Sequence, residues 1–188
     1  MVKLMLPLQS RRVTALATML MLACLGCFDT NSKREADCDR MLQLKADFLQ
    51  SGDREALKEL ESIAVGRDAF RRSYAIWTIG EIGPAAIGTS SLLLASTHSS
   101  DRVTQTAAIQ ALGKVTKGTD VAVTRLLWLL QNEDDYIGSY AARALGEIGP
   151  PAFAALPALK SAASVSPAPN SGTTLPGNAE RAIGKITK

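Results

Sequence analysis

The stretch Tyr140–Pro150 reads Tyr-Ala-Ala-Arg-Ala-Leu-Gly-Glu-Ile-Gly-Pro, and related stretches occur at two earlier places in the chain. Tyr74–Pro84 reads Tyr-Ala-Ile-Trp-Thr-Ile-Gly-Glu-Ile-Gly-Pro, and Ala107–Lys117 reads Ala-Ala-Ile-Gln-Ala-Leu-Gly-Lys-Val-Thr-Lys. Successive inner glycines are 33 residues apart: Gly80, Gly113 and Gly146. A period between about 20 and 50 residues is typical of stacked repeat proteins. The sequence therefore predicts a repeat architecture with three copies of one unit.

Each unit is predicted to contain two helices, and the repeated stretch lies in the first. An aspartate precedes each stretch, where its short side chain would accept N–H groups at a helix start. These aspartates are Asp68, Asp101 and Asp134. Apolar residues then recur at steps of three and four, so they share one helical face, which we expect to be buried. They are Ala75, Ile76, Ile79 and Ile82, then Ala108, Ile109, Leu112 and Val115, then Ala141, Ala142, Leu145 and Ile148.

Glycine and proline indicate where the first helix packs and where it ends. A glycine inside a helix costs about 1 kcal/mol relative to alanine, so the inner glycines indicate close helix crossings. Gly83 and Gly149 are predicted to end their helices in a left-handed conformation, and Pro84 and Pro150 follow them. A leucine thirteen residues after each inner glycine indicates that the second helices are also in register: Leu93, Leu126 and Leu159.

The segment Ala141–Gly149 resembles the repeat core of HEAT-like proteins of the phycobilisome-lyase type, in which Ala-Ala-x-Ala-Leu-Gly-x-Ile-Gly precedes a Pro-rich second helix. The resemblance extends from Arg67 to Lys188 and implies an all-α fold, a short α-solenoid of stacked antiparallel helix pairs. The family places a valine and an arginine just ahead of the Ala-Ala pair. Because other residues stand at most of these places, the sequence does not predict an inter-repeat Asp–Arg ladder. They are Arg71 and Arg72, Thr104 and Gln105, and Ile137 and Gly138.

The N-terminal residues have the layout of a secretory signal. Three basic residues, Lys3, Arg11 and Arg12, precede an uncharged run that ends at Gly26. The segment that ends in Leu25-Gly26-Cys27 resembles a bacterial lipobox, which implies that residues 1–26 are removed and that Cys27 is lipidated. Cys24 is the alternative processed cysteine. We therefore expect an exported protein, anchored by its N-terminal lipid in the bacterial cell envelope, on the periplasmic or the outer surface.

Charge and cysteine content narrow the choice of partners. All 18 acidic residues but only 18 of the 21 basic residues follow residue 26, so the processed chain has a net charge of about zero. This balance gives no support to nucleic-acid binding. After processing, Cys38 remains beside the modified Cys27, so no internal disulfide framework is expected.

The processed chain is predicted to begin with a polar tether, residues 27–37, and to continue as one repeat domain, residues 38–188. Residues 38–65 would form a capping hairpin, with a polar outer face of the kind that terminal repeats need. Three repeats would follow at 66–99, 100–132 and 133–165. A Ser-, Pro- and Gly-rich loop at 166–177 would lead to a half repeat at 178–188, with Asn178 as its helix cap.

No residue pattern indicates catalysis, a cofactor or a metal ion. His98 is the one histidine and is expected in an exposed turn. Glu133-Asp134-Asp135 lacks the alternating ligands and the glycine of a calcium loop. We therefore expect a non-catalytic protein–protein interaction scaffold. The alternative, a bilin-lyase-like enzyme or its accessory subunit, rests on the family name alone.

The second helix of the middle unit gives the candidate binding residues. Val123, Leu126, Leu127 and Leu130 recur at helical spacing and are predicted to face inward. At about 100° per residue, Trp128 would point to the opposite side. The predicted partner-binding residues are Trp128, Arg125, Thr124 and Val121. Second helices line the concave face in this family, so we expect a protein or peptide there. The alternative is that the next unit buries Trp128.

A second tryptophan, Trp77, stands where the other units have polar residues, namely Gln110, Arg143 and Arg181. An indole at such a position implies that another surface covers it. We expect the capping hairpin to do so through Phe48 and Leu49, and a partner protein is the alternative.

Overall fold

The computed structural model describes residues 32–164 and 175–188, and the chain divides into two compact units, Met1–Asp39 and Arg40–Lys188. The predicted signal peptide, Cys24 and Cys27 lie outside the described residues. Residues 32–37, which we expected in the polar tether, are helical. Lysine, arginine, glutamate and alanine favour helices, so a polar composition here does not exclude a regular backbone.

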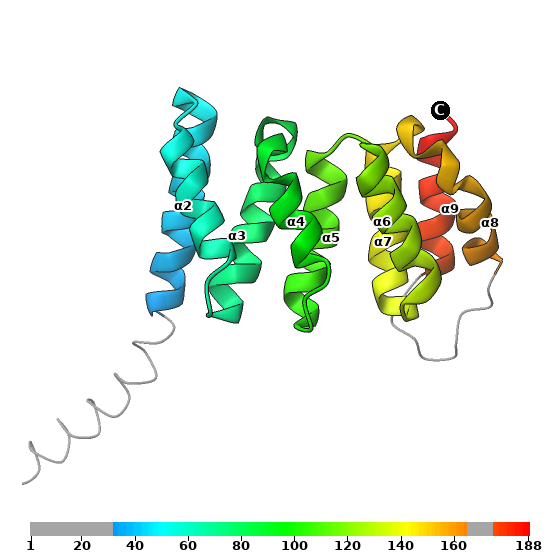
Figure 1. Ribbon diagram of the computed structural model, residues 1–188, viewed down its shortest axis with the longest axis horizontal. Helices are drawn as coiled ribbons and strands as arrows, with labels where there is room; N and C mark the ends of the chain where they lie inside the picture. Colours follow the sequence, from blue (N-terminus) through cyan, green and yellow to red (C-terminus); the bar gives the residue numbers. More distant parts are fainter. Residues whose placement is uncertain (1–31, 165–174) are drawn as a thin grey trace, which may run out of the picture. The chain divides into compact units, whose positions relative to one another are not determined.

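The described part of the second unit consists of helices and turns and contains no strand (Figure 1). Residues 40–51 are helical and are followed by α2 (Arg54–Ala64). The remaining elements are α3 (Ala69–Ile82), the 3-10 helix η1 (Gly83–Thr89), α4 (Ser90–Ser96), α5 (Arg102–Val115), α6 (Asp120–Asn132), α7 (Asp135–Ile148), the 3-10 helix η2 (Pro150–Ala155), α8 (Leu156–Ala163) and α9 (Leu175–Ile186).

The helices stack in the order of the sequence. The first helices of the repeats form one layer in which α3 contacts α5, α5 contacts α7 and α7 contacts α9. The second helices α4, α6 and α8 pack behind α5, α7 and α9, respectively. Each repeat contacts its neighbours, as expected for a solenoid. The predicted all-α fold of stacked helix pairs is therefore confirmed.

The three predicted aspartate caps are confirmed. Each aspartate precedes a first helix and accepts a hydrogen bond from the backbone N–H three residues later. Asp68 Oδ1 accepts from Arg71 N at 2.8 Å, and Asp134 Oδ1 accepts from Ile137 N at 3.0 Å. Asp101 Oδ2 accepts from Thr104 N at 3.1 Å. The helices thus begin where the sequence predicts, because each cap satisfies a backbone donor that has no partner inside the helix.

The predicted core face and the predicted close crossings are also confirmed. All twelve apolar residues of the repeated pattern are buried, and the register leucines Leu93, Leu126 and Leu159 are completely buried. A Cβ atom at Gly80 would lie 2.8 Å from Ala111 Cα, and one at Gly113 would lie 2.9 Å from Ala144 Cα. One at Gly146 would lie 2.9 Å from Ala182 Cα. Glycine is therefore needed because each first helix touches the backbone of the next.

The transitions to the second helices differ from the prediction. Gly83 and Gly149 have positive φ angles of 72° and 75°, but their ψ angles of −145° and −143° lie outside the left-handed helical region. This is a region that only glycine adopts readily. Pro84 and Pro150 then stand in 3-10 helices, each with a kink before the second α-helix begins. The second helices α4 and α8 are consequently short.

Polar contacts between repeats form a ladder that the sequence did not predict. Arg72 Nη2 lies 3.6 Å from Asp101 Oδ2, and Arg72 Nε donates to Thr104 Oγ1 at 3.2 Å. Arg102, one turn before the position where the family has its arginine, pairs with Asp134. We did not expect an Asp–Arg ladder because we considered only the residues at the family's arginine position. Arg102 stands at the helix start, outside that position, and its long side chain still reaches the cap of the next repeat, Asp134.

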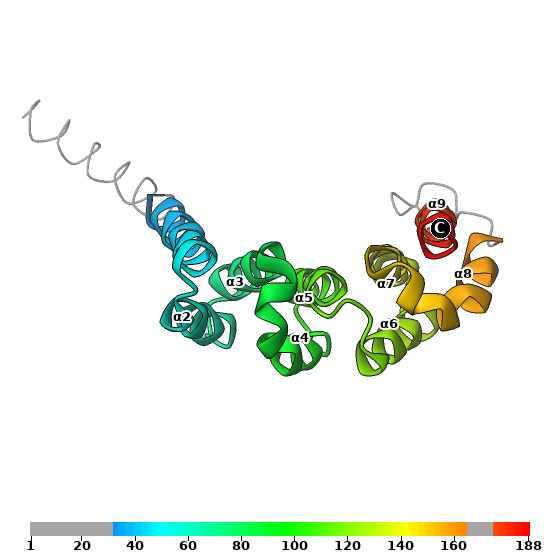
Figure 2. The same ribbon diagram turned by 90° about the horizontal axis from the view of Figure 1, so that it is seen from above.

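The two helix layers lie on opposite sides of the stack. Close backbone contacts join the first helices, and Figure 2 shows α3, α5, α7 and α9 on the inner side of the curve in the second unit. The second helices α4, α6 and α8 lie on the outer side (Figure 2). Our expectation that the second helices line the concave face is therefore wrong for this stack. Inner glycines draw the first helices together, so the layer behind them is spread apart.

Two further expectations need correction. Asn178 does not cap the last helix, because α9 begins at Leu175; the asparagine lies inside the helix and its Nδ2 donates to Ser139 Oγ at 2.7 Å. Residues 175–177 of the predicted loop are thus helical, and residues 165–174 lie outside the described part. The cover expected over Trp77 is incomplete, because Trp77 is 37% exposed and Leu49 is 53% exposed. The indole packs against Tyr74, with ring centroids 5.3 Å apart.

Candidate functional site: a groove between α4 and α6

The middle repeat positions its second helix differently from the other two. Thr116 and Lys117 replace the Gly-Pro pair, the chain turns through positive φ angles at Lys117 (45°) and Gly118 (89°), and α6 follows as one continuous helix. The preceding repeat spends seven residues in η1 before the short α4 begins. The neighbouring second helices therefore differ in length and start, and a groove remains between them.

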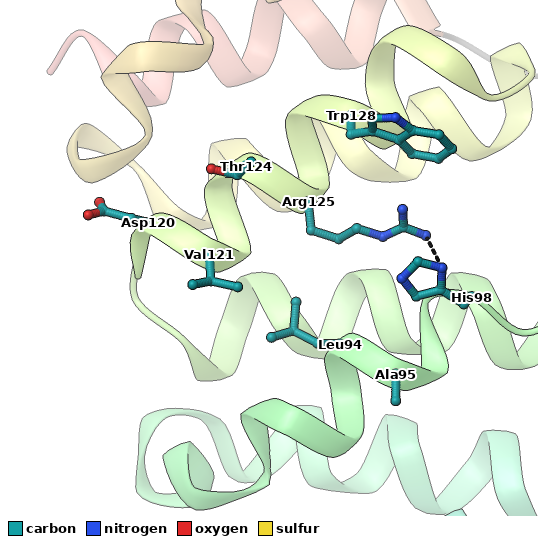
Figure 3. A pocket seen from close by; sticks show the side chains of 8 residues that line it. All are labelled: Leu94, Ala95, His98, Asp120, Val121, Thr124, Arg125 and Trp128. Carbon is teal, nitrogen blue, oxygen red and sulfur yellow. Dashed lines mark hydrogen bonds between the residues drawn. The ribbon is translucent and has the colours of Figure 1, made fainter.

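The groove has a volume of about 610 Å³, within the range of known ligand sites. Its lining comes from α4 and the following turn and from the outward face of α6 (Figure 3). The lining residues are Leu94, Ala95, His98, Asp120, Val121, Thr124, Arg125 and Trp128. All four predicted partner-binding residues thus line one groove. The alternative of a buried Trp128 is excluded within this unit, because the residue is 45% exposed.

The opposite face of α6 explains this placement. Val123, Leu126 and Leu130 are buried as predicted, together with Ala122 and Leu129, whereas Leu127 is half-buried. Burial of this stripe fixes the rotation of α6 about its axis, so residues on the other side face solvent. Val121 is 64% exposed and Thr124 is exposed. The groove therefore exposes apolar surface that the core does not use.

Arg125 joins the two walls of the groove. Its Nε donates to Thr97 Oγ1 at 2.9 Å, and its Nη2 donates to Thr97 O at 3.2 Å. Thr97 is the C-cap residue that directly follows α4, and it is fully buried. A cation at this point interacts favourably with the unpaired carbonyls at the end of α4. The same guanidinium lies against Trp128, with its central carbon 4.7 Å from the ring centroid. Arginine and tryptophan are thereby held in one orientation.

Arg125 forms no direct ion pair among the described residues, and Glu133 acts on its charge only from beyond that range. Among the described residues, none has a carboxylate oxygen within 4 Å of the guanidinium, and Nη1 makes no hydrogen bond. Partial burial lowers the pKa of Arg125 below its usual value, although arginine stays protonated. Asp120, in the first turn of α6, supplies a carboxylate at the other end of the groove (Figure 3). The groove is thus apolar along its length and carries opposite charges at its ends.

His98 is exposed and lies in a turn, as predicted, but it is part of the groove. Its Nδ1 is 3.2 Å from Arg125 Nη2 (Figure 3), and since arginine is always a donor, Nδ1 accepts. Sequence reasoning missed His98, Asp120, Leu94 and Ala95 as groove residues. Only the spacing between repeats could have indicated them, because they come from an adjacent unit or from the start of α6.

The side chains that line the groove are suited to binding. In residues 32–164 and 175–188, no group of three or more histidine, cysteine, aspartate or glutamate side chains is placed to hold a metal ion. Over the same residues, no helix has the length and apolar character needed to cross a membrane. The groove offers an aromatic face, apolar side chains and a rigid guanidinium, which is the composition of interface hot spots.

Comparisons with known proteins agree with the architecture. Residues 89–170 match the family model for HEAT repeats. None of the curated proteins compared with the sequence matches it. Among solved structures, the chain is similar to the crystal structure of an engineered protein, a target of the Northeast Structural Genomics Consortium, with a TM-score of 0.59 and 20% sequence identity over 83% of this chain and 73% of that one. At this identity the similarity concerns the fold alone. Residues 89–170 are thus similar to HEAT repeats, and the fold shared with the solved structure is a stack of helical repeats.

Proposed function

We propose that the chain is a non-catalytic scaffold that binds another protein, and that the groove between α4 and α6 is the contact surface. HEAT repeats commonly serve as protein-interaction scaffolds, and the groove supplies a specific place for a partner. The binding site lies on the outer side of the stack, on the second helices, rather than on the concave side.

The exposed Trp128 packed against Arg125 is the observation that carries this proposal. A half-exposed indole leaves a large apolar surface in water, which costs free energy until a partner covers it. The indole is held by Arg125 and by the fixed rotation of α6, so little conformational entropy is lost on binding. A rigid aromatic residue beside an arginine is the kind of side-chain pair that contributes most to binding energy.

Substitution of Trp128 tests the role of the groove. A photo-reactive amino acid placed at Thr124 of the full chain should cross-link to a partner in detergent-extracted bacterial envelopes, and the same chain with Trp128→Ala should not. For the identified partner, Trp128→Ala should weaken affinity by about 2 kcal/mol or more, as for an interface hot spot. The melting temperature should change little, because the side chain is exposed.

Trp77→Ala is the matched control, because Trp77 is similarly exposed but lies on α3. It should leave cross-linking at Thr124 intact. Equal losses for the two variants, or a loss of roughly 3 to 5 kcal/mol of stability in Trp128→Ala as for a buried aromatic residue, would exclude the groove as the binding site.

We further propose that a lipid on Cys27 anchors the protein in the bacterial cell envelope, facing away from the cytoplasm. The support is the sequence: a basic start, a short uncharged run and Leu25-Gly26-Cys27. A single acyl chain gives marginal membrane binding, whereas two or more chains hold a protein stably. An anchor of this kind would present the groove to envelope proteins.

Metabolic labelling with an alkyne fatty acid tests the anchor. The full chain should take up label, and Cys27→Ala should abolish the uptake and release the protein from membranes. Cys24→Ala is the matched control and should be labelled normally. Undiminished labelling of Cys27→Ala would contradict the assignment, and loss in Cys24→Ala alone would move it to that cysteine.

A further inference from the structure

Resting on the proposed function, we infer that the α4/α6 groove binds an apolar peptide segment that carries a carboxylate, and that Arg125 receives this carboxylate. The segment belongs to a partner protein. It lies along the groove with its acidic side chain or C-terminus at the Arg125 end and with a neutral group near Asp120.

Arg125 has hydrogen-bond donors that no described residue uses. Its Nε and Nη2 are engaged by Thr97 and His98, and they hold the guanidinium in one plane. Its Nη1 has two N–H groups without a partner among the described residues. No carboxylate is in range, whereas the arginines at positions 40, 72 and 102 each pair with a carboxylate of this chain. Arg125 is thus a fixed, partly buried cation that makes no direct ion pair among the described residues, and the carboxylate of Glu133 acts on its charge only from a greater distance.

The surface beside Arg125 is apolar and aromatic. Leu94, Ala95 and Val121 form apolar walls, and Trp128 adds an aromatic face at the Arg125 end (Figure 3). An anion that binds only through charge would be found equally well at an exposed lysine. A group that carries both apolar side chains and a carboxylate is complementary to both features, and partial burial strengthens its contact with the guanidinium.

The charges of Arg125 and Asp120 give the groove a direction. Asp120 is exposed and stands at the opposite end of the groove from His98 (Figure 3). A carboxylate near Asp120 would be repelled, so the charges admit an acidic ligand in one direction only. Complementary charges of this kind select orientation and exclude wrong partners.

A random 12-residue peptide library, selected on the purified full chain in detergent, tests the inference. Peptides that bind in the groove are identified by the loss of their binding to the Trp128→Ala variant. We expect these peptides to share an aspartate or glutamate next to apolar residues. For one such peptide, exchanging the acid for its amide should weaken binding roughly tenfold or more, as expected for a charge-assisted hydrogen bond.

A thermodynamic cycle then assigns the carboxylate to Arg125. Arg125→Gln should weaken binding of the acidic peptide by a similar factor. In this variant the acidic peptide and the amide peptide should bind with equal affinity. Arg125 also donates hydrogen bonds to Thr97, so the melting temperature of the Arg125→Gln variant is measured as well. Asp120→Asn avoids this complication: it leaves Arg125 intact, and it should tighten binding of the acidic peptide but not of the amide.

The possible outcomes separate the two proposals. Groove-dependent peptides without acidic residues, or unequal binding of acid and amide to Arg125→Gln, would overturn the carboxylate inference and leave the scaffold proposal standing. Failure to select any peptide that depends on Trp128 would overturn both. Self-association of the chain that Trp128→Ala abolishes would identify a second copy as the occupant, and it would overturn the inference of a partner peptide.

Discussion

At the scale of single residues, the inner glycine of the repeat occurs in two opposite environments. At Gly113 a Cβ atom would lie 2.9 Å from the Cα, Cβ and O atoms of Ala144, so any side chain would push α5 and α7 apart. Gly184 occupies the same place in the last copy of the motif, but a Cβ atom there would meet nothing within 4 Å. The same residue type is therefore required by packing at one position and not at the other.

Alanine at these two positions should change stability in opposite directions. Gly113→Ala should lower the free energy of unfolding by about 1–3 kcal/mol, as for overpacked cores, although alanine favours the helix by about 1 kcal/mol. Gly184→Ala should raise it by a few tenths to about 1 kcal/mol, since only the helix preference acts. Urea denaturation measures both, and a stabilised Gly113→Ala would contradict the close crossing.

At the scale of helices, the aspartate caps connect helix starts to neighbouring repeats. Asp101 accepts hydrogen bonds from Thr104, whose hydroxyl and backbone N–H both point to it, and it faces Arg72 of the preceding repeat. The side-chain bond from Thr104 is the main cause that lowers the pKa of Asp101. At Asp134 the backbone bond from Ile137 is the main cause of a lowered pKa, and Arg102 adds to it.

These shifts predict how stability depends on pH. A carboxyl group whose pKa is lower in the folded than in the unfolded state stabilises the fold above the unfolded value, near 3.9, and this contribution disappears as the pH falls through the folded pKa. We expect the urea midpoint to be steady between about pH 6 and 7 and to fall below about pH 4. Asp101→Asn combined with Asp134→Asn should flatten this fall while leaving a capping oxygen in place.

Asp135→Asn is the control, because Asp135 stands beside Asp134 but makes no hydrogen bond or ion pair with a described residue. Its acid dependence should match that of the unaltered chain. If the double variant loses stability with acid as steeply as the unaltered chain, other carboxyl groups control acid unfolding.

The helices also show which features could be predicted from the sequence. Capping, core periodicity and glycine crossings are local patterns that repeat every 33 residues, so three copies supported each inference. The 3-10 helices at Pro84 and Pro150 were missed because proline marks the end of one helix without specifying the next conformation. Two of the ladder contacts, from Arg72 and from Arg102, depend on how far long side chains reach across to the next repeat. The periodicity of the sequence does not show how far a side chain reaches toward the next repeat.

At the scale of the whole second unit, the four predicted partner-binding residues came from one helix, whereas the groove is formed by two helices, α4 and α6. The helical wheel placed Trp128 on the side opposite the buried stripe, where it is exposed, because that stripe fixes the rotation of α6. The contribution of α4 and His98 depends on the spacing between repeats. The curvature depends on the close backbone contacts at the inner glycines, which hold the first helices together.

The stacked arrangement also predicts how stability is distributed. Each repeat contacts only its neighbours, so the stability of a solenoid is approximately a sum of repeat and interface contributions. The last helix, α9, packs on α7 and α8 and buries Leu175, Ala179, Ala182 and Ile186. Removing it should therefore weaken the C-terminal repeats first.

The two tryptophans can report this gradient, because Trp77 lies in α3 and Trp128 lies in α6. Single-tryptophan variants, made with Trp77→Phe or Trp128→Phe, should show coincident urea transitions in the full chain. After deletion of residues 175–188, the midpoint reported by Trp128 should fall further than that reported by Trp77, because α6 contacts the uncovered α7 and α8 whereas α3 does not. If both midpoints fall equally, the stack unfolds as one cooperative unit, and the interfaces between repeats are then strong compared with the repeats themselves.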